Sequence, residues 1–150
     1  MNIQDELKQS IPFPNVRAEA IVSVIRTAAV LNHLLNETLK PYGLTMTQFN
    51  VLRILRGSEE SGICGRDIGD RLVSPVPDVT RLLDRMEEMG LLTRRRDTVD
   101  RRYVATFITD KGRALLDEVN PKLEAVAESR FNSIDDEALK SLVTTLEALR

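Results

Sequence analysis

Residues 94–102 read RRRDTVDRR and gather five arginines around two aspartates, between two short apolar runs. A guanidinium offers a planar fork of N–H donors that matches phosphate oxygens and the edges of bases. This chemistry favours a nucleic acid as the partner. The alternative interpretation is that such a run of charges only solubilises an exposed loop.

The positive charge is local to this part of the chain. The protein of 150 residues has 21 basic and 23 acidic side chains. Residues 66–102 hold nine arginines against eight acidic residues, so this segment has a charge of +1 and the remainder a charge of −3. Because a narrow A·T-rich minor groove attracts guanidinium groups, we expect Arg101 and Arg102 to enter it. Asp100 is expected to orient one of them by a salt bridge.

Other kinds of chemistry find little support in the sequence. One cysteine, Cys64, and one histidine, His33, do not make a metal site, so we expect no metal or other cofactor. Nucleophile and phosphate-loop motifs are missing, which argues against an enzyme. Cys64 is better interpreted as a small apolar residue at a helix start than as a redox switch. His33 is expected at the surface or partly packed rather than at a ligand.

Composition predicts one ordinary globular domain, with 42% hydrophobic and 29% charged residues. We expect no membrane span, because no stretch approaches about 18 continuous apolar residues. The N-terminus lacks the basic start and apolar core of a secretion signal, which favours the cytoplasm.

The spacing of apolar residues predicts helices on both sides of the arginine cluster. Apolar residues recur at helical intervals from Asn15 to Lys40, and a sparser stripe ahead of them predicts a short helix or arm. Thr45 and Gln48 form a capping pattern for a second helix, which ends at Gly57. Further helices are expected over 65–73, from the Ser74 cap and Pro75 to Gly90, after Thr109 with a kink at Pro121, and after Asp135.

Two short runs, 91–96 and 103–108, are rich in β-branched and aromatic residues and predict a hairpin. A short helix, a turn and a longer helix with a polar face precede it, which is the helix-turn-helix arrangement. The fold class is therefore mainly α with a small β-hairpin wing, in a single domain over 1–150. A winged helix-turn-helix at 45–109 lies between helical regions at 14–40 and 110–150. These regions carry more apolar surface than one winged domain covers, which predicts dimerisation.

The segment VTRLLDRMEEMGLLTRRRDTVDRRYVATFITDKGRALL resembles the signature of the MarR family of bacterial transcriptional regulators. Its D-x-x-D-R-R wing and the following T-x-K-G-R are the most specific parts, and TMTQFNVLRIL resembles the family's second helix. The resemblance runs from about residue 15 to the C-terminus. It implies a homodimer on a palindromic operator in double-stranded DNA, with recognition helices in successive major grooves and wings in the flanking minor grooves.

The resemblance also implies which residues meet DNA. Thr80 and Arg81 are expected to read bases, and Arg101 and Arg102 to lie near the minor groove. SPVPD departs from the family's usual hydroxyl residues: Asp78 would repel phosphate but could accept a hydrogen bond from cytosine, and Val76 could touch a thymine methyl. The full expected set is Val76, Pro77, Asp78, Thr80, Arg81, Arg85, Arg96, Arg101 and Arg102, with Asp100 as support for the wing.

The leading functional hypothesis is a repressor that a small molecule releases from DNA. The resemblance implies aromatic or phenolic effectors, for which Phe13, Tyr42 and Phe49 could line a pocket, although core packing is the favoured interpretation of each. The alternative from another class is a winged-helix module that binds proteins instead of DNA. An enzyme is the weakest hypothesis, because the sequence shows no convergent nucleophile, base or cofactor motif.

Overall fold

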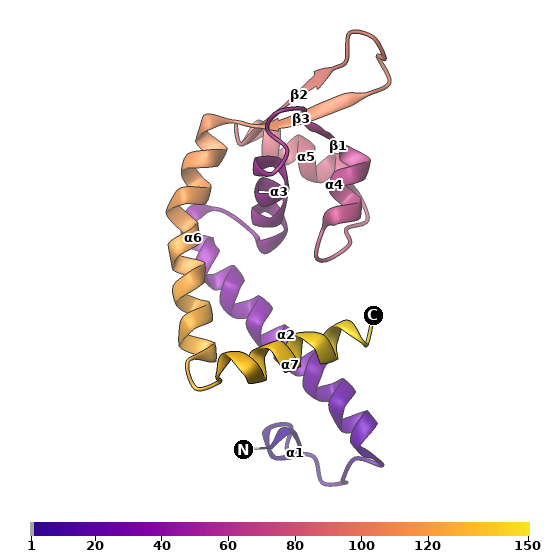
Figure 1. The fold of residues 1–150 in the computed structure, drawn as a ribbon, viewed down its shortest axis with the longest axis vertical. Coiled ribbons are helices and arrows are strands. Elements are labelled where there is room, and N and C mark those ends of the chain that lie inside the picture. Colours follow the sequence, from indigo (N-terminus) through magenta and orange to yellow (C-terminus); the bar gives the residue numbers. More distant parts are fainter. Residues whose placement is uncertain (1) are drawn as a thin grey trace. The chain divides into compact units, whose positions relative to one another are not determined.

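The computed structural model describes residues 2–150, which form two compact units: the described residues up to Met46, and Thr47–Arg150 (Figure 1). The first unit holds α1 (Ile3–Glu6), α2 (Val16–Leu39) and the short 3-10 helix η1 (Lys40–Tyr42). Asn15 caps α2 by accepting a hydrogen bond from the backbone N–H of Ala18. The guanidinium of Arg26 bonds Glu6 at 2.7 Å and ties α1 to α2. The expected long helix and the short helix ahead of it are confirmed.

Helix α2 is unusually apolar for an exposed helix. By length and composition alone, Val16–Tyr42 is able to cross a membrane, with a mean hydropathy of 1.3 and nothing buried in its most apolar stretch. A count of continuous apolar residues does not reveal this, because polar side chains interrupt the stretch. Ile21 and Ile25, one helical turn apart, are 62% and 63% exposed. An apolar face of this kind normally lies against another surface.

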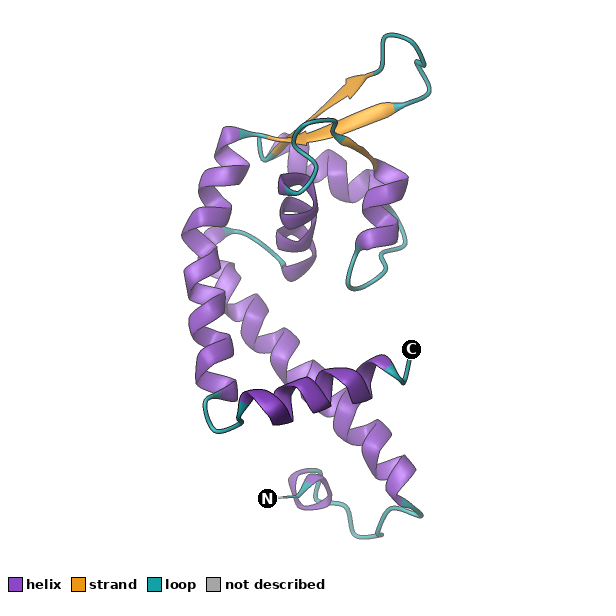
Figure 2. Ribbon diagram, in the orientation of Figure 1, coloured by secondary structure: helices purple, strands orange, loops and turns teal. Residues whose placement is uncertain are grey.

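The second unit contains a small sheet and the remaining helices (Figure 2). The hairpin of β2 (Leu92–Arg96) and β3 (Val104–Ile108) is confirmed, and it projects beyond the helices of this unit. A third strand, β1 (Ile63–Cys64), pairs antiparallel with β3, giving the order β1-β3-β2. The sequence did not reveal β1, because two residues are too few to show an alternating pattern. The helices of the unit are α3 (Met46–Arg56), α4 (Gly65–Arg71), α5 (Val79–Glu88), α6 (Asp110–Phe131) and α7 (Asp136–Glu147).

Two of the predicted helix caps in this unit are confirmed, and one prediction is wrong. The side chains of Thr109 and Asp135 accept hydrogen bonds from the backbone at the starts of α6 and α7. Helix α5, however, begins at Val79 rather than at Ser74 or Pro75. The ring of a proline disfavours helical conformation in the residue before it, so Pro77 keeps Val76 out of the helix. The cap is Asp78, whose carboxylate accepts from the backbone N–H of Arg81 at 2.9 Å.

The core of the second unit draws on every helix from α3 to α6 and on the sheet. Leu52 and Leu55 of α3 are buried there, as are Ile68 of α4 and Met86 of α5. The other fully buried side chains are Val51, Leu91, Leu92, Thr106, Leu116 and Val119. Helix α6 contributes to this core only near its start, and it continues without interruption through Pro121.

The start of α6 is held against the turn that follows α5. Gly90 turns the chain with a φ of 76°, and its carbonyl accepts from the Thr109 hydroxyl at 2.6 Å. The ammonium of Lys111 donates to the carbonyl of Met89 at 2.7 Å. A Cβ on Gly112 would overlap the carbonyl oxygen of Leu91 and lie 2.8 Å from Ile108. The T-x-K-G-R motif is thus a joint between α5, β2 and α6.

Replacing Gly112 with alanine should destabilise the fold. Overpacking of this kind typically costs about 1–3 kcal/mol, which exceeds the roughly 1 kcal/mol that alanine gains over glycine in a helix. Gly57→Ala is the control, because a Cβ there meets nothing closer than 3.5 Å. Urea unfolding measures both variants, and equal stability of the two would contradict the close approach.

Candidate nucleic-acid interface

The exposed face of α5 carries several of the predicted DNA-binding residues. Thr80, Arg81 and Arg85 are exposed, because Leu83 and Met86 bury the opposite face of the helix. Val76, Pro77 and Asp78 precede the helix instead of forming its first turn. The Asp78 carboxylate caps the helix through Oδ1, which fixes this side chain at the start of α5. Its negative charge also lies at the helix end that favours anions.

Two aspartates shape the tip of the wing, residues 97–102. The Asp97 carboxylate accepts from the backbone N–H groups of Val99 at 2.7 Å and of Asp100 at 3.2 Å. The Asp100 carboxylate accepts from the backbone N–H of Arg102 at 3.0 Å. The expected salt bridge from Asp100 to a guanidinium is not among the ion pairs of residues 2–150. Asp100 supports the wing through the backbone instead, which orders the chain beside the two arginines.

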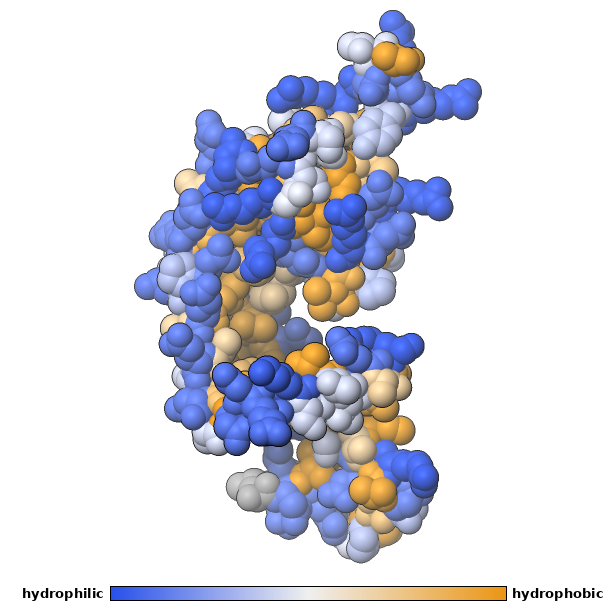
Figure 3. Space-filling view, in the orientation of Figure 1, coloured by the Kyte–Doolittle hydropathy of each residue, from blue (hydrophilic) through white to orange (hydrophobic). Residues whose placement is uncertain are grey.

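The five arginines of the cluster have different surroundings. Arg95, Arg96, Arg101 and Arg102 are exposed, and Figure 3 shows hydrophilic atoms around most of the projecting hairpin end. Arg95 stacks its guanidinium on the ring of Phe107, with 4.7 Å to the ring centroid. Arg94 is half-buried, with its side chain 23% exposed. The sequence alone presents all five as one charge cluster.

Arg94 bonds two carboxylates of α5. Its Nη2 donates to Glu87 at 2.7 Å and to Asp84, its Nε donates to Glu87 at 3.1 Å, and its backbone N–H also donates to Glu87. The pKa of the Arg94 guanidinium is raised above its ordinary value, chiefly because Glu87 hydrogen-bonds its charged form. Sequence reasoning missed this network. The available signal was the period-2 pattern of β2, which places Arg94 on the same side of the strand as the buried Leu92.

The remaining candidate residues do not belong to α5 or to the wing. Cys64 is half-buried at the end of β1 and makes no side-chain cap for α4. His33 is exposed, and Phe49 is buried with the guanidinium of Arg53 over its ring at 5.9 Å. Phe13 and Tyr42 are half-buried in the first unit. Within residues 2–150, no group of three His, Cys, Asp or Glu side chains is placed to hold a metal.

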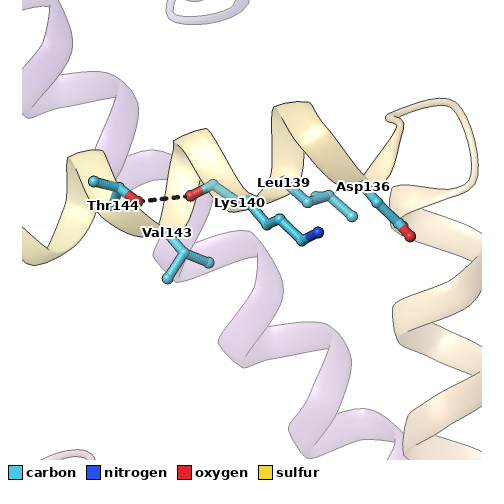
Figure 4. Close-up of a pocket in the computed structure, with 5 residues that line it drawn as sticks. All are labelled: Asp136, Leu139, Lys140, Val143 and Thr144. Carbon is cyan, nitrogen blue, oxygen red and sulfur yellow. Dashed lines mark hydrogen bonds between the residues drawn. The ribbon is translucent and has the colours of Figure 1, made fainter.

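A shallow pocket of about 400 Å³ lies on α7 (Figure 4). Its described lining is Asp136, Leu139, Lys140, Val143 and Thr144, all from this one helix, and the Thr144 hydroxyl bonds the carbonyl of Lys140 at 3.0 Å. A ligand site normally receives convergent groups from several elements. The pocket on α7 therefore lacks the convergent groups of a ligand site.

Comparison with known proteins identifies this arrangement. The sequence model described as the MarR family matches residues 44–104, which span α3, α4, α5 and β2. The HTH-type transcriptional regulator MgrA of Staphylococcus aureus is 31% identical over 136 residues, covering 91% of this chain and 86% of MgrA. The chain belongs to the MarR family. It is therefore a DNA-binding transcriptional regulator, and it comes from a family of regulators, not of enzymes.

Solved structures share the fold of this MarR-family chain. The transcriptional repressor CouR bound to a 23-mer DNA duplex is 24% identical, with a TM-score of 0.80 over 94% of this chain and 99% of that one. CouR from Rhodococcus jostii RHA1 bound to p-coumaroyl-CoA is 24% identical, with a TM-score of 0.72 over 91% and 95%. These likenesses confirm the mainly helical fold with a small antiparallel wing. Family membership also decides against the protein-binding module as the main function.

Proposed function

We propose that this MarR-family regulator is a homodimeric repressor that grips a palindromic operator with α5 and the wing, and that a small aromatic ligand releases it. The observation that carries the proposal is the outward exposure of Arg81 and Arg85 on α5 and of Arg101 and Arg102 on the wing. None of these four belongs to an ion pair among residues 2–150, so their charges are available to phosphate.

Each element has a distinct task in this proposal. Helix α5 enters the major groove, where Thr80 and Arg81 contact base edges while Arg85 and Arg96 contact phosphates. The wing reaches the minor groove with Arg101 and Arg102. Val76 and Pro77, in the loop before α5, lack side-chain donors and suit apolar contact with a thymine methyl. Such a regulator works where chromosomal DNA lies, which for a bacterial protein is the cytoplasm.

Arg101→Ala together with Arg102→Ala should abolish operator binding, because the variant removes two phosphate or groove contacts from each subunit. Fluorescence anisotropy with a palindromic promoter fragment, repeated over a series of salt concentrations, measures the effect. Where binding is still detectable at low salt, the removal of four cationic groups per dimer should make the slope of log K against log [salt] shallower by about 3.6.

The matched control is Lys122→Ala with Arg130→Ala, which removes the same charge from exposed positions of α6. This control should keep the parent's affinity and slope. Unchanged affinity in the wing variant would refute the assignment of the wing to DNA.

The proposal of a homodimer is supported by apolar side chains that are exposed in the single chain. Ile21 and Ile25 of α2 are 62% and 63% exposed, and Val143 and Leu149 near the C-terminus are 53% and 69% exposed. A second copy of the chain is the simplest cover for such faces. A two-fold dimer would separate its recognition helices by one DNA turn, roughly 34 Å, and so match a palindrome.

Ile21→Glu with Ile25→Glu should give a monomer, because four buried carboxylates per interface would have to lose their hydration. Sedimentation velocity at micromolar concentration should then report a mass near 16.9 kDa. Thr27→Glu, on the other side of α2, is the control and should remain dimeric. A dimer in the Ile21→Glu, Ile25→Glu variant would place the interface elsewhere.

The effector proposal rests on the relative whose structure contains p-coumaroyl-CoA, a phenolic thioester. If a ligand of this class binds the DNA-free conformation better, operator affinity should fall by about 5- to 150-fold at saturation. Anisotropy of the operator complex, titrated with p-coumaroyl-CoA, measures this, with coenzyme A as the control. No change at saturating p-coumaroyl-CoA would contradict a phenolic acyl effector.

A further inference from the structure

The recognition helix carries acidic side chains on or beside the face assigned to DNA. Asp84 lies one turn from Arg81 and next to Arg85, and its side chain is 52% exposed. Glu87 follows one turn later, with its side chain 37% exposed. A carboxylate that faces a polyphosphate is repelled, so a DNA-reading helix with two of them needs compensation.

Arg94 supplies that compensation from the first strand of the wing. One guanidinium bonds both carboxylates, and the backbone N–H of Arg94 adds a further hydrogen bond to Glu87 at 3.1 Å. These bonds run from β2 to α5, so the contact that offsets one of the two negative charges also joins the wing to the helix. Across the hairpin, Arg94 pairs with Thr106 of β3.

We propose that Arg94 is a positioning residue of the DNA interface: it does not contact DNA, but holds the wing at a set angle to α5 through its bonds to Asp84 and Glu87. This inference rests on the DNA interface proposed above. The helix and the wing engage different grooves of one duplex, so their contacts support each other only when the two elements are held in register. Preorganisation of this kind adds affinity by reducing the ordering that binding requires.

The first experiment compares Arg94→Ala with Arg96→Ala by operator anisotropy over a series of salt concentrations. Arg96 is the matched residue, because it lies two positions away on the same strand but is exposed. Arg94→Ala should weaken binding by about tenfold or more while the salt slope stays within about 0.5 of the parent's. Arg96→Ala, which removes a phosphate contact from each subunit, should make the slope shallower by about 1.8.

Two variants separate positioning from simple loss of charge or fold. Arg94→Lys keeps the charge but lacks the planar fork, so its affinity should stay close to that of Arg94→Ala. Thermal unfolding and sedimentation of both variants establish that they remain folded dimers at the assay temperature. A slope shallower by about 1.8 in Arg94→Ala, or full affinity in Arg94→Lys, would make Arg94 a phosphate contact and overturn the proposal.

A double-mutant cycle tests the coupling of wing and helix directly. It uses the single variants Arg94→Ala and Arg102→Ala and their combination, measured at low salt, where weak binding is still detectable. If Arg94 positions the wing, Arg102→Ala should cost clearly less affinity in the Arg94→Ala background than in the parent. Fully additive losses would overturn the positioning role but leave the DNA interface intact. No loss from Arg102→Ala in the parent would instead count against the proposed wing contact itself.

Discussion

The bonds from Arg94 to Glu87 and Asp84 join the wing to α5, the two elements to which we assign the DNA interface. A hairpin of two five-residue strands has little stability alone and takes its direction from what it packs against. Here β2 follows the buried Leu91 and begins at the buried Leu92, and its middle residue, Arg94, is bonded to α5. The joint at Gly90, Lys111 and Gly112 adds the start of α6 to the same body.

In the winged unit, several acidic side chains accept hydrogen bonds within the fold, whereas several arginines are exposed. The protein has a net charge of −2, yet its family binds a polyanion. In the winged unit, Asp78 accepts from a helix N-terminal amide, Asp97 and Asp100 accept from amides of the wing tip, and Asp84 and Glu87 accept from Arg94. Each of these carboxylates therefore accepts a hydrogen bond from a donor of the same fold. The exposed arginines of α5 and the wing keep their charges for an external partner.

Local sequence patterns predict the secondary structure that depends on residues close together in the chain. The hairpin, the caps at Thr109 and Asp135 and the long apolar helix follow from the sequence, because turn chemistry, capping and periodicity act over a few residues. The predicted start of α5 is too early, because Pro75 suits a first helical position but Pro77 keeps Val76 out of the helix. Strand β1 escapes prediction because its two residues form a strand only where β3 offers an edge.

By itself, the sequence determined the order of the elements, the family and the presence of a guanidinium-rich wing, since these depend on residue types and their spacing along the chain. Only the tertiary structure decided which arginines stay exposed and which one is bonded within the fold. Arg94, Arg95 and Arg96 are consecutive and chemically identical, yet Arg94 is half-buried and bonds α5, while Arg95 and Arg96 are exposed and Arg95 stacks on Phe107. Their difference arises because β2 folds back against α5, whose Glu87 and Asp84 precede Arg94 by 7 and 10 residues, and pairs with β3, which carries Phe107.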